Sequence, residues 1–277
     1  MDFFRKLLII ILLIVSGCVE PQMEEFHEGE GQEEWLKEVR SILQRDRYEP
    51  PGKLHTISQF AGESESSLMG YTQLFYNQKG QEVLMLAFTA QNDTMSVLLK
   101  NWDSEGKKIE EYLYLHPNWA GNMDELTWSR TNYFIYDKSG RVIEKEFANK
   151  FNERQPSKVF HYNEFGLVEK IEIIHNSKLE ESWILEYDRE KRLIKESWWF
   201  PSAESPNTEF FYRYNENNLL EAKETWTISL NPELEDVFQY FYDDQGRLIE
   251  EKEYYPHGGF SLLYRRAYEY HRSGSVD

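Results

Sequence analysis

The sequence predicts an all-β protein: an antiparallel meander of about eight repeated β-hairpins that forms a curved or solenoid-like sheet, with one short N-terminal helix. Two observations carry this prediction. A turn-like sequence of the type YDKSGR or YDDQGR recurs along the chain at intervals of 25 to 34 residues. The residues before each copy alternate at the period of a strand. The length of 277 residues suffices for one large domain or two small ones.

Each copy of the repeat has the chemistry of a hairpin turn. An aromatic residue is followed, in all copies but the last, by Asp or Asn, whose side chain can accept a hydrogen bond from the backbone two residues on. The fourth residue after the aromatic is most often glycine, which takes the positive φ that a type I turn with a left-handed bulge residue requires. The glycines predicted in this role are Gly80, Gly106, Gly140, Gly166, Gly246 and Gly274. Lys191 and Asn218 stand at the same position in the other two copies, and lysine fits it poorly.

The flanks of the turns read as strands. Phe134 and Tyr136, or Tyr240 and Tyr242, are spaced two residues apart before the turn, and segments such as RVIEKEF follow it. Two strands per repeat of about 26 residues predict one hairpin domain over residues 54–277.

The Tyr-Asp-x-x-Gly-Arg motif resembles the YD repeat of Rhs-type proteins, in which hairpins stack into a curving β-sheet. The resemblance covers about residues 70–274 and implies the hairpin stack. Eight copies are too few for the large encapsulating shells of that family, so the shell function is not expected here.

The first 17 residues predict a signal peptide. Arg5 and Lys6 precede nine apolar residues, which as a helix rise about 14 Å and fall short of a membrane span of about 30 Å. The segment ends in Val15-Ser16-Gly17-Cys18, which resembles the lipobox of bacterial lipoproteins. That resemblance implies cleavage before Cys18, acylation of Cys18, and the outer membrane as destination because residue 19 is not Asp. An ordinary secretory signal with an incidental cysteine is the alternative.

Two further segments precede the hairpin domain. Residues 18–32 hold the predicted lipidated cysteine and an acidic tether with little that could pack. Residues 33–46 predict an amphipathic helix, with apolar residues at helical spacing that end before Pro50. We expect this helix to pack on the body of the protein as a cap on a sheet end; docking of a partner is the alternative.

Charge and motif content exclude several functions. The formal net charge of −18 argues against nucleic-acid binding, which needs Lys and Arg to neutralise phosphates. Cys18 is the only cysteine, so an internal disulfide is excluded. The seven histidines lack metal-ligand spacing, and the sequence contains neither a GxSxG elbow nor a phosphate loop. We therefore expect no cofactor and no metal.

The expected function is non-catalytic binding. Aromatic residues on a curved sheet could hold a sugar or peptide, and Trp183, Trp199 and Trp226 are the candidates, although cross-strand packing is their alternative role. The sequence thus indicates a membrane-anchored envelope lipoprotein whose sheet binds a protein or surface polymer. The alternatives are a glycan hydrolase with paired carboxylates and an acidic immunity protein against a toxin. Two inward carboxylates about 5 to 9 Å apart beside tryptophan would favour the hydrolase.

Overall fold

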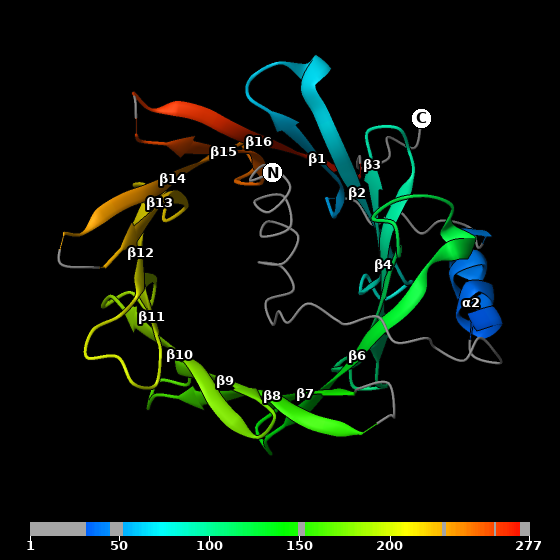
Figure 1. The fold of residues 1–277 in the computed structure, drawn as a ribbon, viewed down its shortest axis with the longest axis horizontal. Coiled ribbons are helices and arrows are strands. Elements are labelled where there is room, and N and C mark those ends of the chain that lie inside the picture. The colour runs from blue at the N-terminus through cyan, green and yellow to red at the C-terminus, as the bar shows by residue number, and fades with distance from the viewer. Residues whose placement is uncertain (1–31, 45–51, 149–152, 229–230, 258, 272–277) are drawn as a thin grey trace.

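A computed structural model of the protein describes residues 32–44, 52–148, 153–228, 231–257 and 259–271 (Figure 1). The predicted signal peptide, Cys18, nearly all of the tether and Gly274 lie outside the described residues.

Within the described residues, sixteen strands form one closed antiparallel barrel. Each strand pairs with its neighbours in sequence, and the first strand pairs with the last. The strands are β1 (Leu54–Ala61), β2 (Leu68–Tyr76), β3 (Glu82–Thr89), β4 (Thr94–Trp102), β5 (Lys108–Leu115), β6 (Thr127–Tyr136), β7 (Val142–Ala148), β8 (Arg154–Tyr162), β9 (Val168–His175), β10 (Lys178–Tyr187), β11 (Leu193–Trp199), β12 (Thr208–Tyr214), β13 (Leu220–Thr227), β14 (Glu233–Tyr242), β15 (Leu248–Tyr255) and β16 (Ser261–Tyr270). The described residues also form a helix, α2 (Gln32–Gln44), and two 3-10 turns, η1 (Glu65–Ser67) and η2 (Met123–Glu125).

The prediction of a curved or solenoid-like sheet is wrong, because the sheet closes. Closure depends on a hairpin that is split between the two ends of the domain. In the other copies the aromatic residue pairs with the first residue of the next strand, as Tyr242 pairs with Leu248. In the last copy Tyr270 pairs in the same way with Leu54, at the start of β1. The last copy therefore takes its second strand from the opposite end of the domain, and neither terminal strand is left as an unpaired edge.

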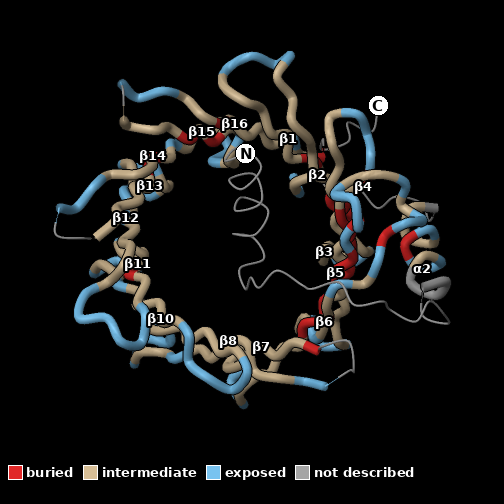
Figure 2. The backbone as a smooth tube through the Cα atoms, viewed as in Figure 1, coloured by how far each residue is buried: buried red, intermediate tan, exposed pale blue. Residues whose placement is uncertain are grey.

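The helix α2 identifies the outside of the barrel. It lies outside the ring (Figure 1), and Val39 and its neighbours pack on side chains of β2 to β5 to form the main buried cluster (Figure 2). The strand residues of this cluster are Phe75, Leu84, Leu86, Val97, Leu99 and Tyr114. These residues therefore face outward. The helix covers the barrel wall instead of capping a sheet end.

Successive residues of a strand point to opposite faces, so the cross-strand register extends this assignment around the whole ring. We call the residues on the face of Leu84 and its cross-strand partners the outer wall, and those on the opposite face the inner wall. The tyrosines of the turn motif belong to the inner wall.

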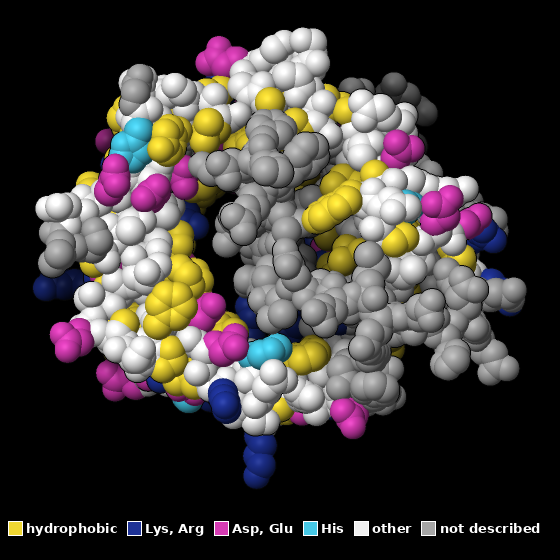
Figure 3. Space-filling model, viewed as in Figure 1, with side chains coloured by type: hydrophobic (Ala, Val, Ile, Leu, Met, Phe, Trp, Pro, Cys, Tyr) yellow, Lys and Arg dark blue, Asp and Glu magenta, His cyan; other side chains and the backbone are white. Residues whose placement is uncertain are grey.

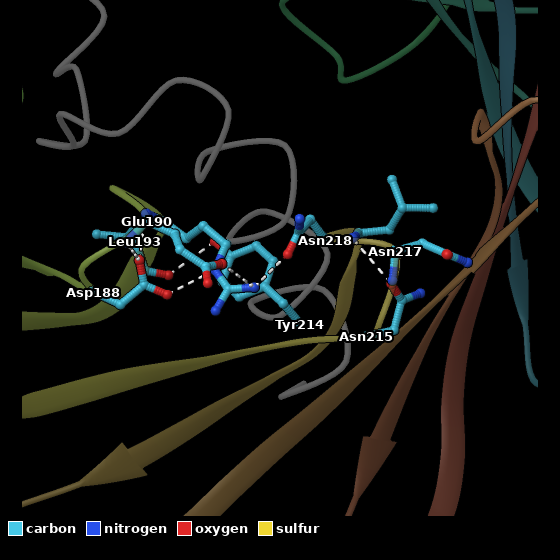
Figure 4. Close-up of polar contacts among 9 residues, drawn as sticks. Asp188, Glu190, Leu193, Tyr214, Asn215, Asn217 and Asn218 are labelled. Atoms are coloured by element: carbon cyan, nitrogen blue, oxygen red, sulfur yellow. Dashed lines mark hydrogen bonds and ion pairs between the residues drawn. The ribbon is translucent and has the colours of Figure 1, made fainter.

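The turns interlock neighbouring hairpins, as the pair of copies at Asp188 and Asn215 shows (Figure 4). Oδ1 of Asp188 accepts hydrogen bonds from the backbone N–H groups of Glu190 and Arg192 at 2.9 Å each. The Arg192 guanidinium donates to Asp188 and reaches Asn218 of the next turn, both at 2.7 Å, and its centre lies 5.0 Å from the Tyr214 ring. The Tyr214 hydroxyl donates back to the Leu193 carbonyl at 2.9 Å. Each turn is thus tied to the next hairpin.

The same bond recurs around the ring. The motif aromatic donates to the carbonyl at the start of the second strand of the preceding hairpin in every copy, from Tyr76 onto Leu54 to Tyr270 onto Leu248. In the second copy the donor is the indole N–H of Trp102. The bond from Tyr76 to Leu54 crosses the split hairpin, so the interlock is continuous through the closure.

Lys191 occupies the conformation that the motif assigns to glycine, with φ at 66°. Replacing Lys191 by glycine should raise the free energy of unfolding by about 0.5 to 1 kcal/mol, because the left-handed region is strained for a residue with a Cβ. The reverse change, Gly246→Val at φ 75°, should lower it by about 1 kcal/mol or more. Urea denaturation measures both. Glu190→Gly, one residue earlier, is the matched control and should bring no gain; a gain equal to that of Lys191→Gly would contradict the argument.

Candidate functional site: the inner wall of the barrel

The barrel is wide enough for its inner wall to enclose a binding space. Strands spaced about 4.8 Å apart and tilted about 40° give a sixteen-strand ring a backbone diameter of roughly 30 Å. Side chains fill the interior of an eight-strand barrel, whereas barrels of sixteen to eighteen strands leave an open lumen. The inner wall is therefore the concave surface on which a ligand would meet many side chains at once.

One arc of the inner wall carries an aromatic cluster, which we define as Trp183, Trp198, Phe200 and Phe210. Trp183 and Trp198 are direct cross-strand partners, with ring centroids 6.3 Å apart. Phe210 lies 5.5 Å from Trp183 and nearly parallel to it, and Phe200 lies 4.9 Å from Trp198. The indole N–H of Trp198 donates to Glu181 at 2.9 Å. Hydrophobic side chains are visible on the inner edge of the ring over β10 to β12 (Figure 3).

A second arc carries a basic cluster, which we define as Lys108, Arg130, Lys145 and Lys158. Lys145 and Lys158 are direct cross-strand partners on β7 and β8. A carboxylate oxygen of Glu111 lies 2.5 Å from the Lys108 ammonium, and its other oxygen lies 3.8 Å from that of Lys145. Lys and Arg side chains are visible inside the ring near β7 and β8 (Figure 3). The cluster thus concentrates positive charge within a strongly acidic protein.

Burial and repulsion act together on Lys145. Desolvation is the largest cause that lowers its pKa to about 8; the positive charges of Lys158, Arg130 and Lys108 lower it further, and Glu111 acts in the opposite sense. The pKa of Lys158 is also lowered, by desolvation and then by Arg130, while Glu181 opposes the shift. Both shifts mean that the charged form of these two lysines lowers the stability of the folded protein.

The third arc, on β11 to β16, combines carboxylates with tyrosines. Tyr212 donates to Glu196 at 2.8 Å, and burial raises the pKa of Tyr212. Glu251 forms an ion pair with Arg266 and accepts a hydrogen bond from Tyr268 at 3.1 Å. Across the ring from the basic cluster, β15 also places Glu253 on the inner wall (Figure 1).

Lys223 lies within this third arc among aromatic rings. Its ammonium is 4.5 Å from the Phe210 ring centroid, 5.6 Å from that of Phe238 and 5.7 Å from that of Tyr212. Desolvation lowers the pKa of Lys223, and Glu196, Glu251 and Glu253 act in the opposite sense. Lys223 thus joins the aromatic cluster to the carboxylates.

The outer wall is polar along the strands that α2 leaves uncovered. Cross-strand and same-strand ion pairs cover it, such as Lys195 with Glu209 at 2.7 Å and Lys170 with Glu172 at 2.6 Å. Arg265 and Lys252 both lie 3.3 Å from Glu250 on the same face. These charges stand in the middle of the strands, where a barrel embedded in lipid carries an apolar band.

The predicted binding residues divide between the two walls. Trp183 lies on the inner wall, whereas Trp199 and Trp226 lie on the outer wall, as partners of Ser182 and Glu209. Neither Trp198 nor the basic cluster was among the binding candidates chosen from the sequence. Their signal was the alternation itself: every second residue before a motif tyrosine shares its face, so Trp183 and Tyr187 lie on one wall.

The predicted turn glycines that the structure describes occupy the left-handed region, with φ between 73° and 86°. Among the described residues, no group of three or more His, Cys, Asp and Glu side chains is arranged to hold a metal ion. In the same part of the chain, no helix has the length and apolar character that crossing a membrane requires.

Raising the pH from 7.5 to 9.5 should raise the midpoint of thermal unfolding, because the pKa of Lys145 in the folded protein, about 8, lies below its unfolded value of 10.5. The unfolded chain binds more protons throughout this window, so stability rises with pH, by on the order of 1 to 2 kcal/mol from this residue. Above about pH 10 the trend should reverse, because the folded barrel keeps protons on buried tyrosines such as Tyr212 and Tyr240, whose pKa values are raised.

Thermal denaturation followed by circular dichroism measures this dependence in wild type and in Lys145→Gln. The variant should lose most of the rise, whereas Lys195→Gln on the outer wall should keep it. An identical rise in wild type and Lys145→Gln would contradict the assignment.

Neither a protein-family model nor a curated protein sequence matches this chain. Among solved structures, a porin-like protein from Bacteroides uniformis is similar, with a TM-score of 0.51 and 10% identity over 79% of this chain and 99% of that chain. A porin-like protein from Bacteroides vulgatus has a TM-score of 0.35 at 10% identity, covering 79% of this chain and 98% of that one. The TcdB2-TccC3 complex has a TM-score of 0.31 at 10% identity, with 74% of this chain and 15% of that chain matched. The first of these shows that the fold is a porin-like β-barrel; the resemblance to YD repeats rests on the turn motif.

Proposed function

We propose that the protein is a lipid-anchored lipoprotein of the bacterial cell envelope whose barrel binds a ligand on its inner wall without transforming it. The observation that carries this proposal is the division of chemistry between the walls. The inner wall gathers an aromatic cluster, a basic cluster and a carboxylate–tyrosine arc side by side, whereas the outer wall beyond α2 pairs its charges locally, as Lys195 does with Glu209. An extended ligand, such as a surface polymer or a segment of a partner protein, would meet all three arcs at once.

The outer wall supports a barrel that stands in water. A lysine or arginine on the lipid face of a barrel costs about 2 to 4 kcal/mol near the bilayer midplane. Lys170, Lys195 and Lys252 alone, with their partner carboxylates, would use most of the roughly 5 to 15 kcal/mol that stabilises a domain. Membrane attachment is therefore assigned to acylation of Cys18, and the similarity to porin-like proteins is consistent with an outer-membrane or envelope location.

The hydrolase alternative is favoured by one observation. Glu251 and Glu253 stand two residues apart on the inner face of β15, which places their Cα atoms about 7 Å apart. Their surroundings differ from the predicted tryptophan-lined pair, because Arg266 and Tyr268 engage Glu251 and Tyr264 is the cross-strand partner of Glu253. This is the pattern of an ion pair that orders the wall, and we therefore propose binding instead of hydrolysis.

The test uses residues 32–277 with panels of neutral and acidic polysaccharides and of peptides. We expect saturable binding without turnover, and at least a tenfold loss of affinity, about 1.4 kcal/mol, in Trp198→Ala. Trp199→Ala is the matched control, since it removes the same side chain one residue on, from the outer wall. Equal losses in both variants would contradict inner-wall binding. Turnover of a glycan that disappears in Glu251→Gln or Glu253→Gln would establish the hydrolase instead.

A further inference from the structure

We propose that the ligand of the inner wall is a neutral polysaccharide. Its sugar rings lie on the aromatic cluster, and its hydroxyl groups donate hydrogen bonds to two carboxylates beside that cluster, those of Glu181 and Glu196. This inference rests on the proposed function, because it names the ligand class of the same inner wall. It is carried by the arrangement of the aromatic rings and by the charges that adjoin them.

The aromatic rings form one row across β10, β11 and β12. Trp183 and Trp198 lie 6.3 Å apart with their ring planes 25° from parallel, and Phe210 lies 5.5 Å from Trp183 at 16°. All three side chains are partly exposed. Side chains of a closed core are buried, as Leu84 and Val97 of the outer wall are beneath α2. The row therefore offers apolar ring surface to a ligand in addition to packing across the strands.

Two carboxylates adjoin this row. One oxygen of Glu181 accepts the Trp198 indole N–H at 2.9 Å. Glu196 is the cross-strand partner of Phe210 and accepts the Tyr212 hydroxyl at 2.8 Å. An ionised carboxylate has about four acceptor positions, so one such bond leaves each group able to accept more. The row thus combines apolar ring surface with hydrogen-bond acceptors.

These carboxylates disfavour an acidic ligand on the aromatic cluster. Glu181 and Lys158 are the two cross-strand partners of Ile173, so Glu181 faces the basic cluster from the strand that carries Trp183. An anionic group on the tryptophans would therefore meet the negative charges of Glu181 and Glu196, and like charges repel each other.

A basic ligand is disfavoured because the protein supplies its own cation at this place. The Lys223 ammonium lies 4.5 Å from the Phe210 ring centroid and 5.7 Å from that of Tyr212. Desolvation lowers the pKa of Lys223, and Glu196 is the strongest of the charges that oppose this shift. A lysine or arginine of a ligand would compete with Lys223 for the same ring and the same carboxylate, and the charge of Lys223 would repel it.

A purely apolar ligand, such as an acyl chain, is disfavoured for a different reason. It would exclude water from Glu181 and Glu196 and offer them no hydrogen-bond donor, and burial of a charged group without such partners is unfavourable. A neutral sugar carries apolar C–H faces and hydroxyl donors in each unit. It is the ligand class that matches the aromatic surface and the carboxylate acceptors together.

The experiment measures binding to residues 32–277, which contain α2 and β1 to β16, by isothermal titration calorimetry. Dextran and hydroxyethyl cellulose are the neutral probes, the carboxymethyl derivative of each is the acidic probe, and diethylaminoethyl dextran is the cationic probe. Wild type should prefer a neutral polymer to its charged derivatives by tenfold or more. Its affinity for the neutral polymer should change less than twofold between about 0.05 and 0.5 M salt, because salt screens charge interactions.

Trp183→Leu tests the aromatic surface, because leucine keeps an apolar side chain in the row and removes the ring. Affinity for the neutral polymer should fall at least tenfold, whereas Trp183→Phe, which keeps a ring, should stay within threefold of wild type. Trp226→Leu is the matched control on the outer wall and should stay within twofold. The midpoint of thermal unfolding shows whether each variant is folded.

The carboxylates are tested through the preference for an uncharged polymer. Glu181→Gln with Glu196→Gln keeps an acceptor oxygen at each position and removes both negative charges. The preference for a neutral polymer over its carboxymethyl derivative should fall at least fivefold. Glu172→Gln with Glu209→Gln removes two charges from the outer wall and should leave this preference unchanged. A structural defect alone would weaken binding of both polymers equally.

The outcomes separate this inference from the proposed function. If an acidic polymer, a cationic polymer or a peptide binds more tightly than every neutral polysaccharide of the panels, the neutral-glycan assignment is overturned and inner-wall binding stands. Equal binding of the neutral polymer by wild type and Trp183→Leu would also overturn the assignment. If no probe of any class binds, both proposals are overturned.

Discussion

In a host that processes lipoproteins, replacing Cys18 with serine should move almost all of the protein from the membrane fraction to the soluble fraction. The sole cysteine is the predicted site of acylation, and each buried acyl CH₂ group contributes about 0.8 kcal/mol to membrane attachment. With the acyl chains gone, the barrel offers the membrane a wall of ion pairs such as Lys195 with Glu209. Cell fractionation and labelling with a palmitate analogue measure the two parts of the effect.

Ser16→Ala is the matched control, because it keeps a small residue in the lipobox-like segment and should leave anchoring intact. Residues 32–277 made without the anchor should be monodisperse in buffer without detergent. If Cys18→Ser stayed in membranes at wild-type levels, the barrel itself would be held by the bilayer. That result would contradict the proposal that the charged outer wall faces water.

Ending the chain after Phe260 should abolish cooperative unfolding and promote aggregation. This truncation removes β16, so that β1 keeps only β2 and β15 keeps only β14 as a partner strand. In a closed ring the loss opens two edges at once and breaks the bond from Tyr270 to Leu248. In a solenoid-like stack, loss of the terminal strand would remove one neighbour contact and leave the remainder folded.

Ending the chain after His271 provides the control. That truncation keeps β16 and the backbone bonds of His271 to Gly52 and Lys53, so the unfolding midpoint should stay within a few degrees of wild type. A monomeric, cooperatively folding chain that ends at Phe260 would contradict closure. Thermal denaturation and light scattering distinguish the results.

The turns could be read from the sequence because their chemistry is local. Asp or Asn, and a residue at positive φ three positions after it, determine each hairpin, and even Lys191 and Asn218 take the conformation that the pattern assigns to them. The helix was also predictable, within two residues at each end, from its apolar spacing. In these elements the determinants lie within a few residues of one another.

Closure could not be read in this way. It joins Ile57 to Tyr268, which are more than 200 residues apart, so the pairing is not encoded by a short local pattern. The last copy of the motif differs from the others in its pairing, because its aromatic residue Tyr270 pairs with Leu54 at the opposite end of the domain. Its partner strand, β1, precedes the first motif and resembles an ordinary strand.

The site was predictable only in part, for a related reason. Strand alternation places Trp183 and Trp199 on opposite walls but does not say which wall is inside. That distinction comes from α2, which covers the wall of Leu84 and Val97. The basic cluster joins residues of four strands, β5 to β8, and its lysines are spaced like those of solvated strands elsewhere in the sequence.

Protection of single introduced cysteines by bound ligand tests most directly whether the ligand binds on the inner wall. Residues 32–277 lack the native cysteine, so Thr225→Cys on the inner wall and Ser182→Cys on the outer wall each introduce one thiol. The rate of maleimide modification is compared with and without a saturating concentration of a polymer that binds in the polysaccharide and peptide panels. Slowing of Thr225→Cys alone is the result we predict. Slowing of Ser182→Cys, or of neither thiol while calorimetry shows the polymer bound, would contradict a ligand site inside the barrel.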